Sequence, residues 1–221
     1  MKNNTKKKEI IIIDYQLGNL FSVNQALTNI GLNTRISCDP KDIANADAIV
    51  LPGVGAFGDA MKNLKEMGLI ESIKEYVKSG KPFLGICLGL QLLFDESEEF
   101  GSTQGLGMIK GYVKRFYSKQ SPEKGLKVPQ IAWNQVFKGE NRSWDNTPLM
   151  GIKQGEYVYF VHSYYVEPLE DVAITYTTYG KTKYVSSILK NNIFACQFHP
   201  EKSADEGLKI YRNWALQNNL L

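Results

Sequence analysis

The first half of the chain alternates short apolar runs with segments in which apolar residues recur at helical spacing. Glu9 to Ile13 is typical of a buried strand, and Leu20 to Ile30 then places its apolar residues on one helical face. Further strands are predicted over residues 33–37, 46–51 and 82–86, and helices over 69–77 and 88–94. Such strand–helix alternation favours parallel pairing, with helices on both faces of a sheet.

The second half changes to strand-like segments separated by turn residues. Strands are predicted over 111–116, 128–137, 156–161, 172–177, 184–189 and 193–198. Ser203 with Glu206 matches a capping box, which predicts a final helix through Trp214. We therefore expect one α/β domain over residues 9–221, built on a central mixed, mostly parallel sheet flanked by helices.

Composition narrows the class of protein. The formal net charge is +3, and four lysines lie within residues 1–8, a polar start that we expect to be disordered. Nothing in the charge therefore indicates nucleic acid or membrane binding. No apolar run resembles a signal peptide or reaches the roughly 20 residues of a membrane span. Three sparse cysteines fit a reducing cytoplasm, and with two histidines they leave no metal site or cofactor to expect.

The segment Gly85-Ile86-Cys87-Leu88-Gly89 carries the first candidate chemistry. It is the cysteine version of the G-x-S-x-G nucleophile elbow, with a predicted strand before it and a helix after it. A sharp turn there would expose Cys87, and the glycines would avoid clashes. The helix dipole would favour the thiolate, and the Leu88 N–H would donate to an oxyanion. Cys38 and Cys196 lack such glycines and are expected to be small core residues.

A cysteine nucleophile needs a base, and the base needs an orienting partner. His199 follows the last predicted strand, and Glu201 lies two residues on. In an extended segment residues two apart point the same way, so Glu201 could hold the imidazole. His162 is the rival base, but no acid lies near it in the sequence, and we expect it to be structural or to line the site.

The glycine-rich segment Pro52 to Gly58 admits two functional interpretations. It contains G-x-G-x-x-G, but it follows the third strand, and Glu71 and Glu75 fall in a helix where a ribose contact is not expected. A dinucleotide-dependent oxidoreductase is therefore disfavoured. A turn beside the elbow could instead bring N–H groups to an oxyanion, or could simply connect a strand to a helix.

Together these motifs resemble class I, or triad-type, glutamine amidotransferases. The resemblance is closest to the glutaminase subunits of imidazole glycerol phosphate synthase, and it runs nearly end to end. The segments that carry it are 14–15, 18–20, 52–55, 85–93, 94–99, 105–107, 133–134, 159–164 and 198–203.

The resemblance implies a role for each matching residue. Cys87 attacks glutamine, His199 moves protons and Glu201 orients His199. The remaining implied roles are an oxyanion strand at Gly53, Val54 and Gly55; substrate binding by Gln91, Glu99, Ser163 and Tyr164; and a partner interface or ammonia exit at Trp133, Asn134, Tyr159 and Lys202. The implied partner is a (β/α)₈ cyclase subunit that forms a heterodimer and uses the ammonia in histidine biosynthesis.

Gln130 and Ala132 depart from the His and Gly that this family usually has there, at positions expected to meet the partner. They keep open a paralogous glutaminase that supplies ammonia to a cyclase-like synthase for surface-glycan sugars. Two other classes remain to be weighed. A non-catalytic regulatory module is disfavoured by the intact Cys87, His199 and Glu201. A cysteine peptidase is disfavoured by Gln91 and the segment 159–164, which favour glutamine over a peptide.

Overall fold

A computed structural model describes residues 7–116, 126–140 and 142–221. The strands are β1 Glu9–Ile13, β2 Asn33–Ser37, β3 Ala48–Leu51, β4 Phe83–Ile86, β5 Phe94–Ser97, β6 Thr103–Gln104, β7 Ile109–Arg115, β8 Gln130–Lys138, β9 Glu156–His162, β10 Tyr164–Pro168, β11 Ala173–Tyr179, β12 Thr182–Lys190 and β13 Ile193–Cys196. The helices are α1 Leu20–Asn29, α2 Pro40–Asn45, α3 Phe57–Glu66, α4 Leu69–Lys78, α5 Leu88–Gln91, the 3₁₀ helix η1 Pro200–Lys202 and α6 Ala204–Gln217. Most of the expected disordered start, residues 1–6, lies outside the described residues.

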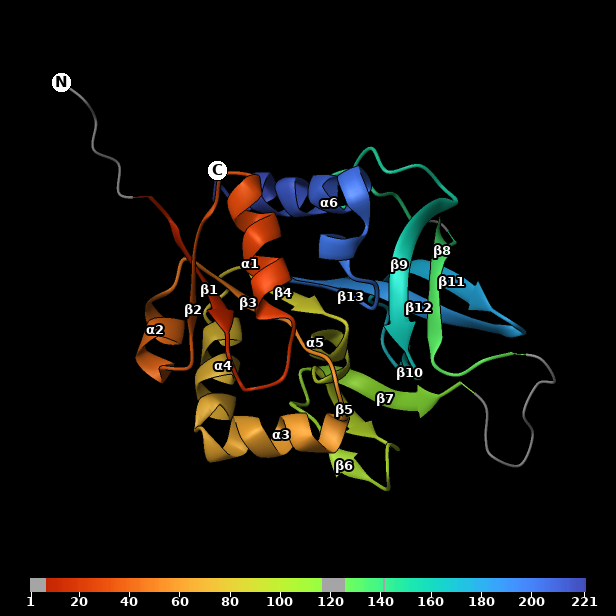
Figure 1. The fold of residues 1–221 in the computed structure, drawn as a ribbon, viewed down its shortest axis with the longest axis horizontal. Coiled ribbons are helices and arrows are strands. Elements are labelled where there is room, and N and C mark those ends of the chain that lie inside the picture. Colours follow the sequence, from red (N-terminus) through yellow and green to blue (C-terminus); the bar gives the residue numbers. More distant parts are fainter. Residues whose placement is uncertain (1–6, 117–125, 141) are drawn as a thin grey trace.

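The structure confirms an α/β fold with a mixed sheet. Strands β2, β1, β3, β4 and β13 are parallel neighbours and form its centre. On the far side of β13 the sheet continues antiparallel through β12, β10 and β7, and β11, β8 and β9 extend it from β12. The helical half and the strand-rich half lie at opposite ends of the molecule in Figure 1.

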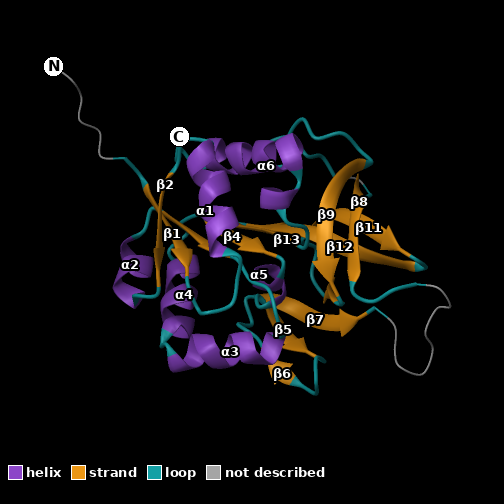
Figure 2. Cartoon of the chain, viewed as in Figure 1, coloured by secondary structure: helices purple, strands orange, loops and turns teal. Residues whose placement is uncertain are grey.

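Helices cover both faces of the parallel strands, as alternation along β1 requires. Ile10 and Ile12 pack in one buried cluster with side chains from α1 and α6, whereas Ile11 and Ile13 pack in a second cluster with α2, α3 and α4. Figure 2 shows these two helical layers above and below the central strands. The result is a sheet covered on both faces, whose carboxyl edge is free to hold side chains.

Three local expectations were wrong. Helix α5 ends at Gln91, because the Leu92 and Leu93 carbonyls accept hydrogen bonds from Leu106, Met108 and Ile109 rather than continuing the helix. The capping box does not form, since Ser203 makes no side-chain cap and donates instead to the His199 carbonyl at 2.7 Å. Cys38 is exposed, so it is not a core residue, whereas Cys196 is buried as expected.

Candidate active site

The ends of three parallel strands bring the candidate residues together. Gly53 follows β3, Cys87 follows β4 and His199 follows β13, so all three lie at the carboxyl edge of the sheet. Residues 34 to 146 positions apart in the sequence thus meet because their strands are neighbours. The described residues contain no helix long and apolar enough to cross a membrane, and they include no group of three or more His, Cys, Asp or Glu that could hold a metal ion.

Cys87 has the strained backbone of a nucleophile elbow. Its φ of 54° lies in the left-handed region, which non-glycine residues seldom adopt. The glycines are sterically required: a Cβ at Gly89 would lie 1.8 Å from the Leu51 carbonyl oxygen, and one at Gly85 would lie 2.9 Å from the Ala195 Cβ. The Cys87 N–H donates to the Cys196 carbonyl at 2.8 Å, which ties the elbow to β13.

The thiol is less exposed than the elbow pattern suggests. Cys87 is only 5% exposed and lies against a cavity of about 210 Å³. Because α5 has a single turn, its dipole offers the sulfur little, and neighbouring side chains must supply most of the stabilisation. The cavity brings together all four expected substrate-binding residues with the sulfur: Gln91, Glu99, Ser163 and Tyr164.

His199 and Glu201 are paired, although not in the way the sequence suggested. The His199 Nδ1 lies 2.7 Å from the Glu201 Oε1, and both side chains are almost fully buried. The expected extended segment is instead a turn into η1, which carries Glu201 back beneath the imidazole. The other Glu201 oxygen accepts a hydrogen bond from the Tyr211 hydroxyl on α6 at 3.1 Å, a contact that the sequence does not signal.

The imidazole of His199 is surrounded by groups that favour its charged form. Burial lowers its pKa, but Cys87, and after it Glu201, more than offset this and raise the pKa to about 10. The buried Nε2 of His199 forms no hydrogen bond with any of the described residues. A cysteine and a protonated histidine in this arrangement can form a thiolate–imidazolium pair, which is a nucleophile and an acid side by side.

His162 has the opposite character. It is fully buried, and burial lowers its pKa to about 3, which keeps it neutral at ordinary pH. Its Nδ1 lies 2.8 Å from the Tyr164 carbonyl oxygen and its Nε2 lies 3.3 Å from the Tyr184 hydroxyl. His162 lines the same cavity but is held by these neighbours, in keeping with the expected structural role.

The expected oxyanion donors are not all free. The Leu88 N–H donates to the Gly53 carbonyl at 3.3 Å, so this peptide presents an oxygen where a developing oxyanion would need a hydrogen. Gly53 itself is tightly enclosed, since a Cβ there would lie 2.0 Å from the Tyr15 hydroxyl oxygen. Val54 and Gly55 also line the cavity, and Gly55 has a φ of 109°.

Three of the four expected interface residues form one group on the surface. Trp133 is 49% exposed and packs edge-on against Tyr159, with ring centroids 6.1 Å apart, and the Lys202 ammonium lies 5.7 Å from the centroid of Tyr159. Asn134 does not join them, because its side chain donates to the Thr178 carbonyl at 2.9 Å.

The two departures from the family pattern also differ in placement. Gln130 is wholly buried and accepts a hydrogen bond from the Tyr184 hydroxyl at 3.1 Å, so the expectation that it meets a partner is wrong. On β8, Gln130 lies directly opposite His162 of β9 in the strand register. Ala132 is half-buried on β8.

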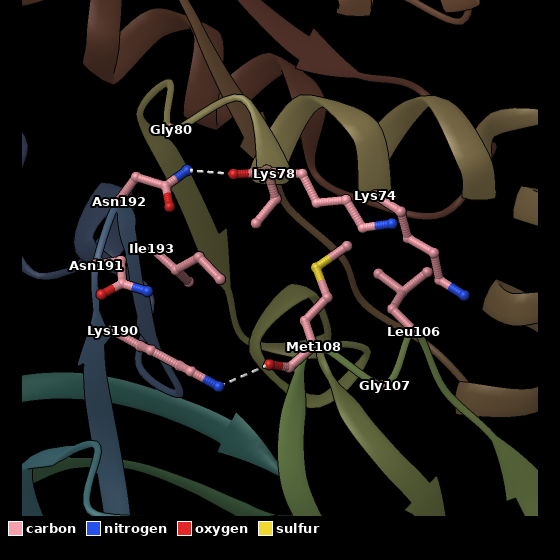
Figure 3. Close-up of a pocket in the computed structure, with 11 residues that line it drawn as sticks. Lys74, Lys78, Gly80, Leu106, Gly107, Met108, Lys190, Asn191, Asn192 and Ile193 are labelled. Carbon is pink, nitrogen blue, oxygen red and sulfur yellow. Dashed lines mark hydrogen bonds between the residues drawn. The ribbon is translucent and has the colours of Figure 1, made fainter.

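A larger cavity, of about 590 Å³, lies elsewhere. It is bounded by the end of α4, residues 106–108 and the turn between β12 and β13 (Figure 3). Within it Lys190 donates to the Met108 carbonyl at 3.1 Å and Asn192 donates to the Val77 carbonyl at 3.0 Å. Because this cavity lies at the amino ends of β4 and β13, it contains none of the candidate site residues.

Gln197 is a buried residue of the candidate site that the sequence motifs did not indicate. Its side-chain nitrogen lies 3.5 Å from the Cys87 Sγ, and it is completely inaccessible to solvent. The only signal in the sequence is a glutamine inside the apolar run 193–198, directly before the motif that contains His199. A buried amide in a strand needs partners, and this one finds them in the candidate site.

Comparisons with known proteins agree with this geometry. A family model described as class-I glutamine amidotransferase matches residues 11–218. The chain is 48% identical over 212 residues to an imidazole glycerol phosphate synthase subunit HisH from Sulfurimonas denitrificans, which covers 96% of this chain and 99% of the relative. It is 50% identical over 207 residues to the subunit of the same name from Aquifex aeolicus, with 92% and 94% covered.

Solved structures support the fold alone, because their sequences are distant. A structure of PurLQS from Thermotoga maritima superposes with a TM-score of 0.70 at 19% identity and covers 95% of this chain and 98% of that one. A structure described as a glutamine amidotransferase superposes with a TM-score of 0.71 at 16% identity, again with 95% and 98% covered.

Proposed function

Since this chain belongs to the class-I glutamine amidotransferase family, we propose that it is the glutaminase subunit of an imidazole glycerol phosphate synthase. The observation that carries the activity is the convergence of Cys87 with the His199–Glu201 pair beside a cavity lined by Gln91 and Glu99. The names of the relatives, at 48% and 50% identity over nearly the whole chain, support the particular synthase.

The chemistry follows from the groups present. The Cys87 thiolate attacks the side-chain amide carbon of glutamine, and His199 gives its proton to the departing nitrogen, so that ammonia leaves and a glutamyl thioester remains. Water then attacks the thioester while His199 takes up a proton, the S–C bond breaks and glutamate is released. Glu201 keeps the imidazole oriented through both halves, because it is itself fixed by Tyr211.

The proposed oxyanion site would be incomplete in the chain alone, which would keep glutamine hydrolysis slow. With the Gly53 carbonyl bonded to the Leu88 N–H, the tetrahedral intermediate lacks that donor until the peptide between Gly53 and Val54 turns. A partner that favours the turned peptide would activate hydrolysis by a population shift. The glycine at position 55 gives this segment the conformational freedom that turning requires.

The partner is proposed to be a (β/α)₈ cyclase that receives the ammonia. Support comes from the exposed group Trp133, Tyr159 and Lys202, which is joined to the site by a hydrogen bond of 2.9 Å from the His199 N–H to the Tyr159 carbonyl. The glycan-pathway alternative loses its main support, because Gln130 faces inward rather than toward a partner.

The test is to assay the chain alone, with purified cyclase, and with cyclase plus its acceptor substrate. We expect little glutamine hydrolysis alone and stimulation in the complete mixture. Cys87→Ser should abolish hydrolysis of glutamine yet leave synthesis from added ammonium salts intact, since the cyclase needs only the ammonia. Retained hydrolysis in Cys87→Ser would refute the assignment of Cys87 as the nucleophile. Full activity of the chain alone would refute the proposal that the Gly53 carbonyl keeps the free chain inactive.

A further inference from the structure

Two buried glutamines form a chain of hydrogen bonds that ends at the Cys87 sulfur. Gln197 donates from Nε2 to the Cys87 Sγ, with 3.5 Å between the two atoms. Its Oε1 accepts a hydrogen bond of 3.1 Å from the Nε2 of Gln91. Gln91 is 5% exposed and Gln197 is fully buried, so water does not compete for either amide.

The direction of this chain is fixed by a backbone carbonyl. The same Gln91 Nε2 donates a second hydrogen bond, of 2.9 Å, to the Tyr164 carbonyl oxygen, which can only accept. The nitrogen of Gln91 must therefore face Tyr164 and Gln197, and the atom of Gln197 that receives its other hydrogen must be the oxygen. The Gln197 nitrogen is left facing Cys87, so this side chain offers the sulfur a donor. The sulfur has one backbone acceptor as well, since the Cys87 thiol donates to the Val161 carbonyl at 3.8 Å.

We infer that Gln197 is a positioning residue that stabilises the Cys87 thiolate and links it to the substrate cavity. This inference rests on the proposed function, since it concerns the same sulfur. A charged sulfur at a buried position needs hydrogen-bond donors, and donors to a charged group form the stronger bonds. The Leu88 N–H is already occupied by Gly53, so Gln197 supplies a donor that the elbow itself does not.

Gln197 also differs from His199 in what it can do during the reaction. His199 gives its proton to the leaving nitrogen and so loses its charge when the thioester forms. An amide N–H keeps its hydrogen throughout, and therefore stabilises the sulfur both before attack and when the thioester breaks. Because Gln91 lines the cavity and holds Gln197, a substrate that moves Gln91 also adjusts the donor at the sulfur.

The test uses alkylation of Cys87 by iodoacetamide, which does not depend on glutamine turnover. The thiolate forms an S–C bond as iodide leaves, so the rate follows the thiolate fraction. Gln197→Met keeps the bulk and removes the donor. We expect the pH profile of alkylation, normalised to its own high-pH plateau, to move upward by about half to one pH unit, which lowers the normalised rate about threefold to tenfold on the rising limb of the profile.

Gln130→Met is the matched control. Gln130 is also a fully buried glutamine near the cavity, but it pairs with Tyr184 and not with Cys87. Its profile should coincide with that of the native chain. An unmoved profile in Gln197→Met, or equal displacement in both variants, would overturn the inference. In that case the proposed glutaminase could still hold, because Cys87→Ser tests it separately.

A second measurement is made on the native sequence, so it tests the inference even if Gln197→Met does not fold. With the glutamine side chains labelled by ¹⁵N, the Gln197 amide resonance should shift along with the ionisation of Cys87 and should stop doing so in Cys87→Ser. A Gln197 signal that ignores the ionisation of Cys87 would contradict the hydrogen bond. In steady state, Gln197→Met should lower kcat with the cyclase while changing KM little, whereas a general packing defect would move both.

Discussion

His162 is a buried neutral base, and its burial should make the fold sensitive to acid. Its pKa is lowered by burial from 6.5 to about 3. Between these two values the unfolded chain binds a proton on this side chain and the folded chain does not. The free energy of unfolding must therefore rise with pH through this window, and stability is lost as the pH falls from about 6.5 toward about 3.

The size of the effect follows from the two pKa values. Protonation of the unfolded chain costs the fold about 0.2 kcal/mol at pH 7 and about 2 kcal/mol at pH 5. A loss of about 2 kcal/mol is a substantial part of the stability of an ordinary domain. Below about pH 3 the folded protein would also take up the proton, and the loss would level off.

The assay is urea unfolding of the native chain and of His162→Gln at several pH values between about 5 and 7.5. Glutamine cannot ionise and still offers an N–H to the Tyr164 carbonyl. We expect the drop in unfolding free energy from pH 7 to pH 5 to be about 2 kcal/mol smaller in the variant. Carboxylates and His199 titrate in both chains, so their contributions cancel in the comparison. Identical pH slopes would refute the claim that His162 is held neutral.

Two further predictions concern the oxyanion strand and the surface group. Gly53→Ala should lower the free energy of unfolding by about 1–3 kcal/mol through overpacking, because its Cβ would lie 2.0 Å from the Tyr15 hydroxyl oxygen. Adding Tyr15→Phe should recover part of this loss, and strictly additive losses in urea unfolding would contradict the contact. Trp133→Ala should weaken binding to the purified cyclase by about 2 kcal/mol in calorimetric titration. Phe21→Ala, at a residue 70% exposed on α1, should leave the affinity unchanged.

Local patterns predicted the parts of the site that depend on neighbours in sequence. The glycines around Cys87 predicted a sharp turn between a buried strand and a helix, and the structure has that turn after β4. His199 follows the last strand as predicted, and the neighbouring positions of β4 and β13 bring it to the same sheet edge as Cys87. The pairing of His199 with Glu201 was anticipated for the wrong reason, since η1 and not an extended strand brings the carboxylate back.

The contacts that the sequence could not reveal join residues far apart. The Leu88 N–H meets the Gly53 carbonyl, and the Gln197 amide meets the Cys87 sulfur, across separations of 35 and 110 positions. Periodicity reports which face of an element is buried, but it does not report which polar atom faces which. The proposed oxyanion site depends on the orientation of the peptide between Gly53 and Val54, and no residue type encodes that orientation.

Tyr159 connects the exposed side chains of Trp133 and Lys202 to the backbone of His199. Its ring contacts both Trp133 and the Lys202 ammonium. Its carbonyl accepts from the His199 N–H at 2.9 Å, and its N–H donates to the Ser203 hydroxyl oxygen at 3.0 Å. Ser203 in turn donates to the His199 carbonyl at 2.7 Å, so the backbone of His199 is held to β9 on both sides. A partner that displaces Tyr159 must therefore move His199 or break these bonds. His199 and Ser203 are buried, so breaking these hydrogen bonds would leave polar groups without partners away from water. A shift of the His199 backbone therefore costs less free energy than breaking the bonds. Contact of the proposed partner with Tyr159 would thus shift the backbone of His199.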